Sequence, residues 1–253
     1  VEFPTTLRYI ENTAFQQNAT LQSFNITNPS ALTSLCSAIF AGSNALLSAD
    51  LSGISADLSN SGSMFNNCTS LTSFTMKNNT AVTTVPATFL ANCTAMTVAN
   101  FSGSTNIAAF SDNVFRSNTS LIALYLGSDT PPSLSFASNA QTFALINNGG
   151  LSQSDRTLYV PTNTGAANFS AISAWTDIFG SIQTQSQPGD TFDDGALSYK
   201  IESLSPFEVS VTGFSGAAVA DLVIPSTASN SGQAYSVVGI STSAFKSISG
   251  LVT

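Results

Sequence analysis

The sequence contains no histidine and unusually few charged residues. The absence of histidine excludes Ser-His-Asp and Cys-His catalysis and removes the commonest metal-binding side chain. Charged residues make up 8% of the chain, against roughly 25% in ordinary soluble domains. With so little charge, the surface must be made polar by Ser, Thr and Asn instead.

Basic residues and long apolar runs are also scarce. The 6 Lys and Arg stand against 14 Asp and Glu, so the formal net charge is -8. An acidic chain without a basic stripe repels phosphate backbones, and we expect no nucleic-acid partner. The longest purely apolar run, 121–126, is far shorter than the roughly 18 residues of a membrane-spanning segment. We therefore expect no membrane insertion.

Cysteine is rare too, and the 3 cysteines cannot all pair within the chain. Their spacing matches neither a disulfide framework nor a zinc site. The segment Asp190–Gly195 superficially suggests a calcium loop, but Phe192 and Ile201 stand where that loop needs ligands. We expect no bound metal and no cofactor.

The sequence does contain a repeat, and its period is 25 residues. Each unit is anchored by a large apolar residue, and these anchors are Phe15, Phe40, Phe65, Leu90 and Phe115. Six residues after the anchors come Leu21, Leu46, Leu71, Met96 and Leu121. Nine residues after them come Phe24, Ala49, Phe74, Ala99 and Leu124, and eleven after them Ile26, Leu51, Met76, Phe101 and Leu126. These last three columns form the L-x-x-L-x-L-like line of a leucine-rich-repeat strand.

One coil of this length cannot close a core by itself, but stacked coils can. Stacking places equivalent apolar residues of successive coils about 4.8 Å apart, so that each column becomes a continuous interior ladder. The predicted fold class is therefore an α/β solenoid of the leucine-rich-repeat type. Parallel strands form one face, and each anchor lies on a short turn or helix-like segment behind it.

The third unit departs from the pattern. Other units have an apolar pair before the anchor, such as Leu7 and Ile10, which marks the second wall of the coil. Here the pair is replaced by Asp57 and Asn60. We expect this unit to bulge, with Leu58 as a substitute core residue.

A column of small residues lies three positions after the anchors, and it allows two interpretations. Its members are Asn18, Ser43, Cys68, Cys93 and Asn118. In the first interpretation, the column is buried and satisfies backbone groups of the turns, with Cys68 and Cys93 as free thiols. In the second, these two cysteines form a disulfide or redox pair. Their side chains would point the same way, which is poor disulfide geometry, and we favour the first.

The period is lost after the fifth unit, at about residue 126. We predict an irregular unit over 127–157 and a cap over 158–182, because a solenoid end must be covered. The cap contains a short amphipathic helix over 166–179. Its apolar residues are expected to face the last coil, and they are Phe169, Ile172 and Trp175.

Residues 1–182 are thus predicted to form one solenoid domain. Residues 183–195 read as a linker from their Gln, Ser, Pro and Gly content. Residues 196–253 then contain a lead-in hairpin and the first, incomplete unit of a second repeat array anchored on Phe245. Because the chain starts at Val1 without Met and stops inside a unit, we expect it to be part of a longer protein.

These motifs resemble the BspA-like leucine-rich-repeat proteins. The family unit runs like I-x-x-x-A-F-x-x-C-x-x-L-x-x-I-x-L, and the segments Ile10 to Ile26 and Ile240 to Leu251 are similar to it. Segment 158–182 resembles the terminal unit of the family, and 192–203 resembles its lead-in strand. The resemblance implies a secreted or cell-surface protein that engages host matrix proteins, cells or glycans through a solenoid face. It brings no catalytic motif, so we expect no enzyme and assign no catalytic residue.

A candidate binding face follows from strand geometry, because residues between inward columns must point outward. The candidate residues are Ser23, Asn25, Ser48, Asp50, Ser73, Thr75, Asn100 and Tyr125. One interpretation is a plain soluble sheet surface. The other is a shallow hydrogen-bonding platform with Tyr125 as its aromatic anchor.

Three functions remain open. The sequence favours an adhesion module, which we expect to be monomeric. A structural surface spacer would show no saturable binding. A carbohydrate-active enzyme would need two carboxyls in one cleft, but the acids of the five units fall in different columns, and they are Glu11, Asp50, Asp57 and Asp112.

Overall fold

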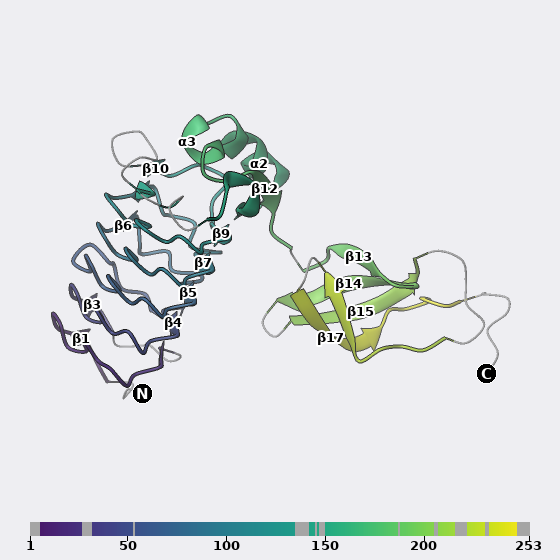
Figure 1. Ribbon diagram of the computed structural model, residues 1–253. Coiled ribbons are helices and arrows are strands. Elements are labelled where there is room, and N and C mark those ends of the chain that lie inside the picture. The colour runs from purple at the N-terminus through teal and green to yellow at the C-terminus, as the bar shows by residue number, and fades with distance from the viewer. Residues whose placement is uncertain are drawn as a thin grey trace. The chain divides into compact units, whose positions relative to one another are not determined.

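The computed structural model divides into two compact units, Val1–Gln185 and Ser186–Thr253 (Figure 1). We call them the solenoid unit and the C-terminal unit. The residues that the structure describes are 6–26, 32–52, 54–134, 142–144, 146, 150–186, 188–204, 207–215, 222–230 and 233–246.

The solenoid unit is built around a parallel sheet with the strand order β12-β11-β9-β7-β5-β4-β2. Its strands are β2 (Ser23–Asn25), β4 (Ser48–Asp50), β5 (Ser73–Thr75), β7 (Val98–Asn100), β9 (Ala123–Tyr125), β11 (Thr157–Val160) and β12 (Ser181–Thr184). Ser23 pairs with Ser48, and Ser48 pairs with Ser73, so equivalent positions of successive units lie side by side. The predicted parallel-strand leucine-rich-repeat solenoid is confirmed.

A second wall of short parallel strands runs along the coils and is interrupted once. β1 (Tyr9–Ile10) pairs with β3 (Ser34–Leu35). Further on, β6 (Thr84–Val85), β8 (Ala109–Phe110) and β10 (Ser133–Leu134) form a separate sheet.

The interruption falls on the irregular third unit, where residues 54–60 form no strand. Leu58 is fully buried there, as predicted. Beside it, the buried hydroxyl of Ser61 donates a hydrogen bond to the carbonyl of Leu35 at 2.6 Å. A side chain thus supplies a donor to the last residue of β3.

The anchor segments are turns that stack on one another as a third ladder. The anchor N–H of each coil donates to a carbonyl of the next coil: Phe15 to Ile39 at 2.9 Å, Phe40 to Met64 at 2.9 Å and Phe65 to Phe89 at 2.9 Å. The anchor is flanked on both sides by residues with left-handed backbone, which fold the turn tightly. These are Thr13, Gln17, Ala38, Gly42, Ser63, Asn67, Thr88, Asn92, Asn113 and Ser117. In the described part of the chain, helix occurs only after the fifth coil.

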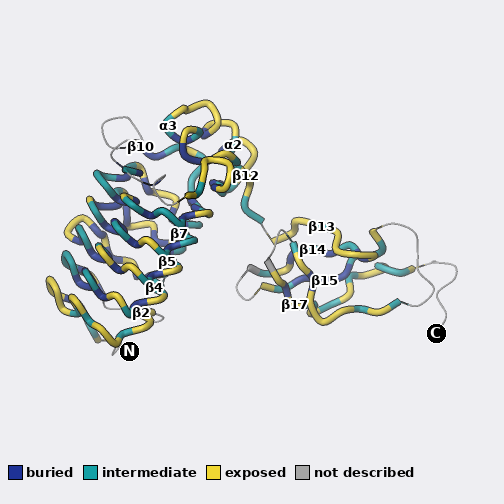
Figure 2. The backbone as a smooth tube through the Cα atoms, viewed as in Figure 1, coloured by how far each residue is buried: buried dark blue, intermediate teal, exposed yellow. Residues whose placement is uncertain are grey.

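The interior is filled by the predicted apolar columns. Leu46, Leu71, Met96 and Leu121 are fully buried, whereas Leu21 is half-buried in the first coil. Buried stretches, dark blue in Figure 2, recur in successive coils of the solenoid unit. The anchor rings stack on each other, with centroids 5.4 Å apart for Phe15 and Phe40 and 5.2 Å apart for Phe40 and Phe65. Where the anchor is Leu90, the ring of Phe89 continues the aromatic column and packs edge-on against Phe65 at 5.5 Å.

The irregular unit is tied together by Arg156, whose side chain is buried. Its guanidinium donates to the carbonyls of Ser152 at 3.0 Å, Ile146 at 3.1 Å and Leu151 at 3.2 Å. Burial lowers the pKa of this guanidinium from its usual value. The guanidinium therefore holds the backbone of the loop up to Ser152, the N-cap of the short 3-10 helix η3 (Gln153–Asp155).

The end of the stack is covered by two short helices, α2 (Asn163–Ser170) and α3 (Ser173–Thr176) (Figure 1). Phe169 and Trp175 are buried, with ring centroids 5.1 Å apart. The expectation that Ile172 faces the core is wrong, because this residue is 40% exposed. Ile172 is the extended residue between the two helices, so a single helical phase does not run through it.

The C-terminal unit is a mixed sheet with the strand order β13-β14-β15-β17-β16 and its own apolar core. Its strands are β13 (Thr191–Asp194), β14 (Leu197–Leu204), β15 (Phe207–Phe214), β16 (Thr227–Asn230) and β17 (Gln233–Ile240). The strands predicted for the hairpin are β14 and β15, which pair antiparallel. The predicted linker 183–195 is too long, because β13 lies within this range and pairs with β14.

The end of β17 leads into a turn that repeats the local structure of the first coil. Ser243, two residues before Phe245, has left-handed backbone, as Thr13 has two residues before Phe15. The hydrogen bonds Ala244 N–H to Ser241 O and Lys246 N–H to Ser243 O also match those of the first coil. Leu251, which the sequence placed in this unit, lies outside the described residues.

Candidate binding surface

The outer face of the seven-stranded sheet carries two columns of side chains. In β2, β4, β5, β7 and β9 the middle residue is buried and the residues on either side are exposed or half-exposed. The pairing brings Ser23, Ser48 and Ser73 into one column. The other column runs through Asn25, Asp50, Thr75, Asn100 and Tyr125. All eight predicted site residues therefore lie in two adjacent lines; we call this surface the strand face.

The outward residues of the last two strands were not among the predicted residues of this face, although a strand at 158–161 follows from its apolar run. β11 and β12 add Thr157 and Ser181 to the first column and Tyr159 and Gln183 to the second. The irregular unit is longer than the repeat, so the 25-residue period does not reach these positions. A signal was present, because Thr157-Leu-Tyr-Val160 repeats the pattern of Ala123-Leu-Tyr-Leu126.

The main aromatic feature of the strand face is a pair of tyrosines. Tyr125 and Tyr159 are register partners on β9 and β11. Their rings are stacked with centroids 4.4 Å apart and planes 8° from parallel. This distance is close to the spacing of neighbouring strands, about 4.8 Å. The rings therefore stand side by side across the strands, and each restricts the side-chain conformations of the other.

Two candidate residues also hold the chain where it leaves the sheet. Oδ1 of Asp50 accepts the N–H of Ser52 at 2.8 Å, and Oδ1 of Asn100 accepts the N–H of Ser102 at 2.9 Å. One oxygen of each side chain is thus engaged in a turn. The other terminal atom, Oδ2 of Asp50 or Nδ2 of Asn100, is the one that a ligand could use.

The column with the two cysteines lies inside the solenoid and does not belong to the strand face. The cysteines are free, and Cys68 and Cys93 are buried. Sγ of Cys68 donates to the carbonyl of Phe40 at 3.0 Å, and Oγ of Ser43 donates to the equivalent carbonyl of Phe15 at 2.7 Å. Burial raises the pKa of the Cys68 thiol to about 12. The interpretation of this column as buried and structural is confirmed for Ser43, Cys68, Cys93 and Asn118, whereas Asn18 in the first coil is half-buried.

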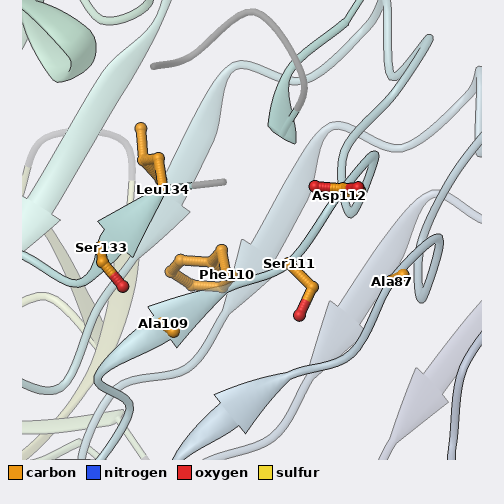
Figure 3. Close-up of a pocket in the computed structure, with 7 residues that line it drawn as sticks. All are labelled: Ala87, Ala109, Phe110, Ser111, Asp112, Ser133 and Leu134. Atoms are coloured by element: carbon orange, nitrogen blue, oxygen red, sulfur yellow. The ribbon is translucent and has the colours of Figure 1, made fainter. Parts of the chain in front are cut away.

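A separate hollow of about 400 Å³ opens on the second wall (Figure 3). It is lined by Ala87, Ala109, Phe110, Ser111, Asp112, Ser133 and Leu134. Among these lining residues, Asp112 carries the single carboxyl. The described residues also contain no cluster of three or more side chains suited to a metal ion. The geometry here offers an open apolar floor of Phe110 and Leu134 but no pair of acids.

A family model described as BspA type Leucine rich repeat region matches residues 1–122 in six copies. The repeat region of this chain belongs to the BspA-type leucine-rich-repeat family. The BspA-type match ends just before β9, so Tyr125 and Tyr159 lie beyond it. No curated protein matches the chain.

A BspA-type solenoid is a repeat-protein scaffold, and such scaffolds typically bind through an extended face rather than catalyse reactions. The fold alone does not name the ligand. No helix within the described ranges has the length and apolar content to span a membrane.

Proposed function

We propose that this chain is a non-catalytic adhesion module of a secreted or cell-surface protein. In this proposal the strand face binds a host matrix protein, a cell surface or a glycan. The supporting observation is the register of the strand face, which aligns outward side chains over seven consecutive strands. An extended, pre-formed face of this kind can hold a long ligand without ordering loops first.

The stacked tyrosines favour this function over a structural spacer. A spacer needs only a soluble surface, and Ser, Thr and Asn would supply that alone. Tyrosine is enriched at binding hot spots because it offers a large contact area with few rotatable bonds. Two tyrosines in register on a face otherwise made of small side chains indicate a contact point.

The test is binding of the full chain to extracellular-matrix proteins, intact cells and immobilised glycans. We expect saturable binding to at least one of them. Replacing Tyr125 and Asn100 together by Ala should weaken it about tenfold, because loss of a hot-spot residue costs more than about 1 kcal/mol.

The matched control is Tyr9→Ala, which removes a tyrosine that is 61% exposed on β1, outside the strand face. Its binding should equal that of the unmodified chain. Absence of saturable binding to all three targets would support the spacer instead. Release of reducing sugar from the glycans would support an enzyme.

A further inference from the structure

The tyrosine pair forms a step on the strand face. The rings are stacked across the strands, so the plane of Tyr125 is turned towards the neighbouring strand β7. On that side the next residues of the same column are Asn100 and Thr75, and the other column offers Val98. All three side chains are shorter than tyrosine. The ring therefore forms a wall above a floor of small residues.

The side chains on both sides of the tyrosine pair can form hydrogen bonds with a ligand. Thr75 has a hydroxyl, and Gln183, which follows Tyr159 in register on β12, has an amide. Asn100 offers its Nδ2 as a donor, because its Oδ1 accepts the N–H of Ser102. A hydroxyl or an amide offers both a donor and an acceptor. Sugar hydroxyls have the same dual character, and a pyranose also has an apolar face that can lie against an aromatic ring.

The near absence of charged side chains on the strand face narrows the class of ligand further. Of the fourteen outward positions on these seven strands, Asp50 alone carries a charged side chain. Without Lys or Arg, the strand face has no group to neutralise a sulfate, a sialic acid or an acidic peptide, and the net charge of -8 adds repulsion. It also lacks the Trp and Arg that accompany Tyr in protein hot spots. An uncharged ligand with many hydroxyls fits best.

We propose that the strand face binds a neutral saccharide chain, with one sugar ring against Tyr125 above Asn100 and Thr75. The chain lies across β5, β7 and β9. Tyr159 supports the ring of Tyr125 from behind through their stack at 4.4 Å. This inference rests on the proposed function and names its ligand class.

The experiment measures binding of the full chain to linear oligosaccharides of glucose, galactose, mannose and N-acetylglucosamine, with heparin as the anionic comparison. We expect saturable binding to at least one neutral series and none to heparin. Binding should not change at about 1 M salt, where the Debye length falls to roughly 3 Å.

Variants locate the site. Tyr125→Ala and Tyr159→Ala should each weaken binding about tenfold, whereas Tyr125→Phe keeps the ring and should bind within about twofold. Tyr9→Ala should again have no effect. Thermal melts establish that each variant is folded.

The outcomes separate this inference from the function on which it rests. If a matrix protein binds and Tyr125→Ala weakens it, but no neutral oligosaccharide binds, the ligand class is wrong and the adhesion function stands. If oligosaccharides bind and both tyrosine variants bind equally well, the site is wrong. If periodate treatment of a cell surface that binds the chain leaves binding unchanged, the saccharide inference also fails.

Discussion

At the scale of single residues, Ser43, Cys68 and Cys93 show what the buried polar column requires. Each donates from its side chain to the anchor carbonyl of the preceding coil, namely that of Phe15, Phe40 or Phe65. In these three coils the position prefers a small donor, which Ser supplies with its hydroxyl and Cys with its thiol. A buried cysteine that acted only as a small apolar residue would have no such preference.

Variants of Cys68 should differ in stability according to whether the side-chain donor is kept. Cys68→Ser keeps the donor and should be more stable than Cys68→Ala by about 1 kcal/mol, the net worth of a typical hydrogen bond. Urea unfolding of the two variants measures the difference. The opposite order, with Ala milder than Ser, would show that the thiol acts as an apolar filler.

The same thiols make stability depend on alkaline pH. Burial raises the pKa of Cys68 from 9.0 to about 12, and it raises that of Cys93 as well. Between these two pH values the folded chain holds protons that the unfolded chain has lost, so stability falls as pH rises. For Cys68 alone the slope approaches about 1.4 kcal/mol per pH unit.

The measurement compares unfolding free energies below pH 9.0 and above it for the chain and its Cys68→Ser, Cys93→Ser double variant. All other ionisable groups are common to both proteins, so the difference between the two slopes isolates the two thiols. Equal slopes would contradict a buried, protonated pair.

At the scale of elements, Asp129 joins the start of the irregular unit to the covering helices. Its carboxyl accepts the N–H of Thr162 at 3.0 Å and the hydroxyl of Thr162 at 2.7 Å. Thr162 in turn is the N-cap of α2 and accepts from the N–H groups of Thr164 and Gly165. One carboxylate thus holds the residue that starts the helix.

Asp129→Ala should therefore loosen the helix end and destabilise the solenoid unit by about 1–2 kcal/mol, as loss of a helix cap does. Hydrogen exchange of the α2 amides and the thermal midpoint measure the effect. Asp177→Ala is the matched control, because Asp177 is an exposed acid on the same cap. A change of comparable size in both variants would show that Asp129 has no special role.

Elements were predictable from the sequence where one side-chain type recurs at fixed spacing. The inward columns of the seven-stranded sheet are large and apolar in almost every unit, so period and strand positions follow directly. The turn ladder gave no such signal, because its left-handed positions are occupied by Thr, Ala, Ser, Asn, Gln and Gly without a common type. Backbone pairing between coils fixes these turns more than residue preference does.

The residues of the strand face were also predictable only where the 25-residue repeat specifies them. The outward positions up to Tyr125 followed from the period, whereas Tyr159 required the length of the irregular unit, which no repeat specifies. The engagement of Asp50 and Asn100 in turns was also not foreseen, since it depends on where each strand ends.

At the scale of the whole molecule, the two units have separate apolar cores. We predict two thermal transitions in calorimetry. Trp175→Ala should lower the midpoint of one, because truncating a buried Trp costs about 3–5 kcal/mol. Tyr235→Ala should lower the other, since Tyr235 is buried in the C-terminal unit. A single transition that responds to both variants would mean that the units unfold together.

The uniform contact between coils has a consequence for how such a chain can change length. Every joint between the first five coils uses the same amide-to-carbonyl bonds at the turn and the same strand register. Excision of residues 77–101 would bring two coils together through equivalent hydrogen bonds and remove one strand, β7, from the strand face. A splice that is one residue out of frame would turn the interior side chains outward. Gene segments that encode this solenoid can therefore be gained or lost without unfolding it only in whole coils.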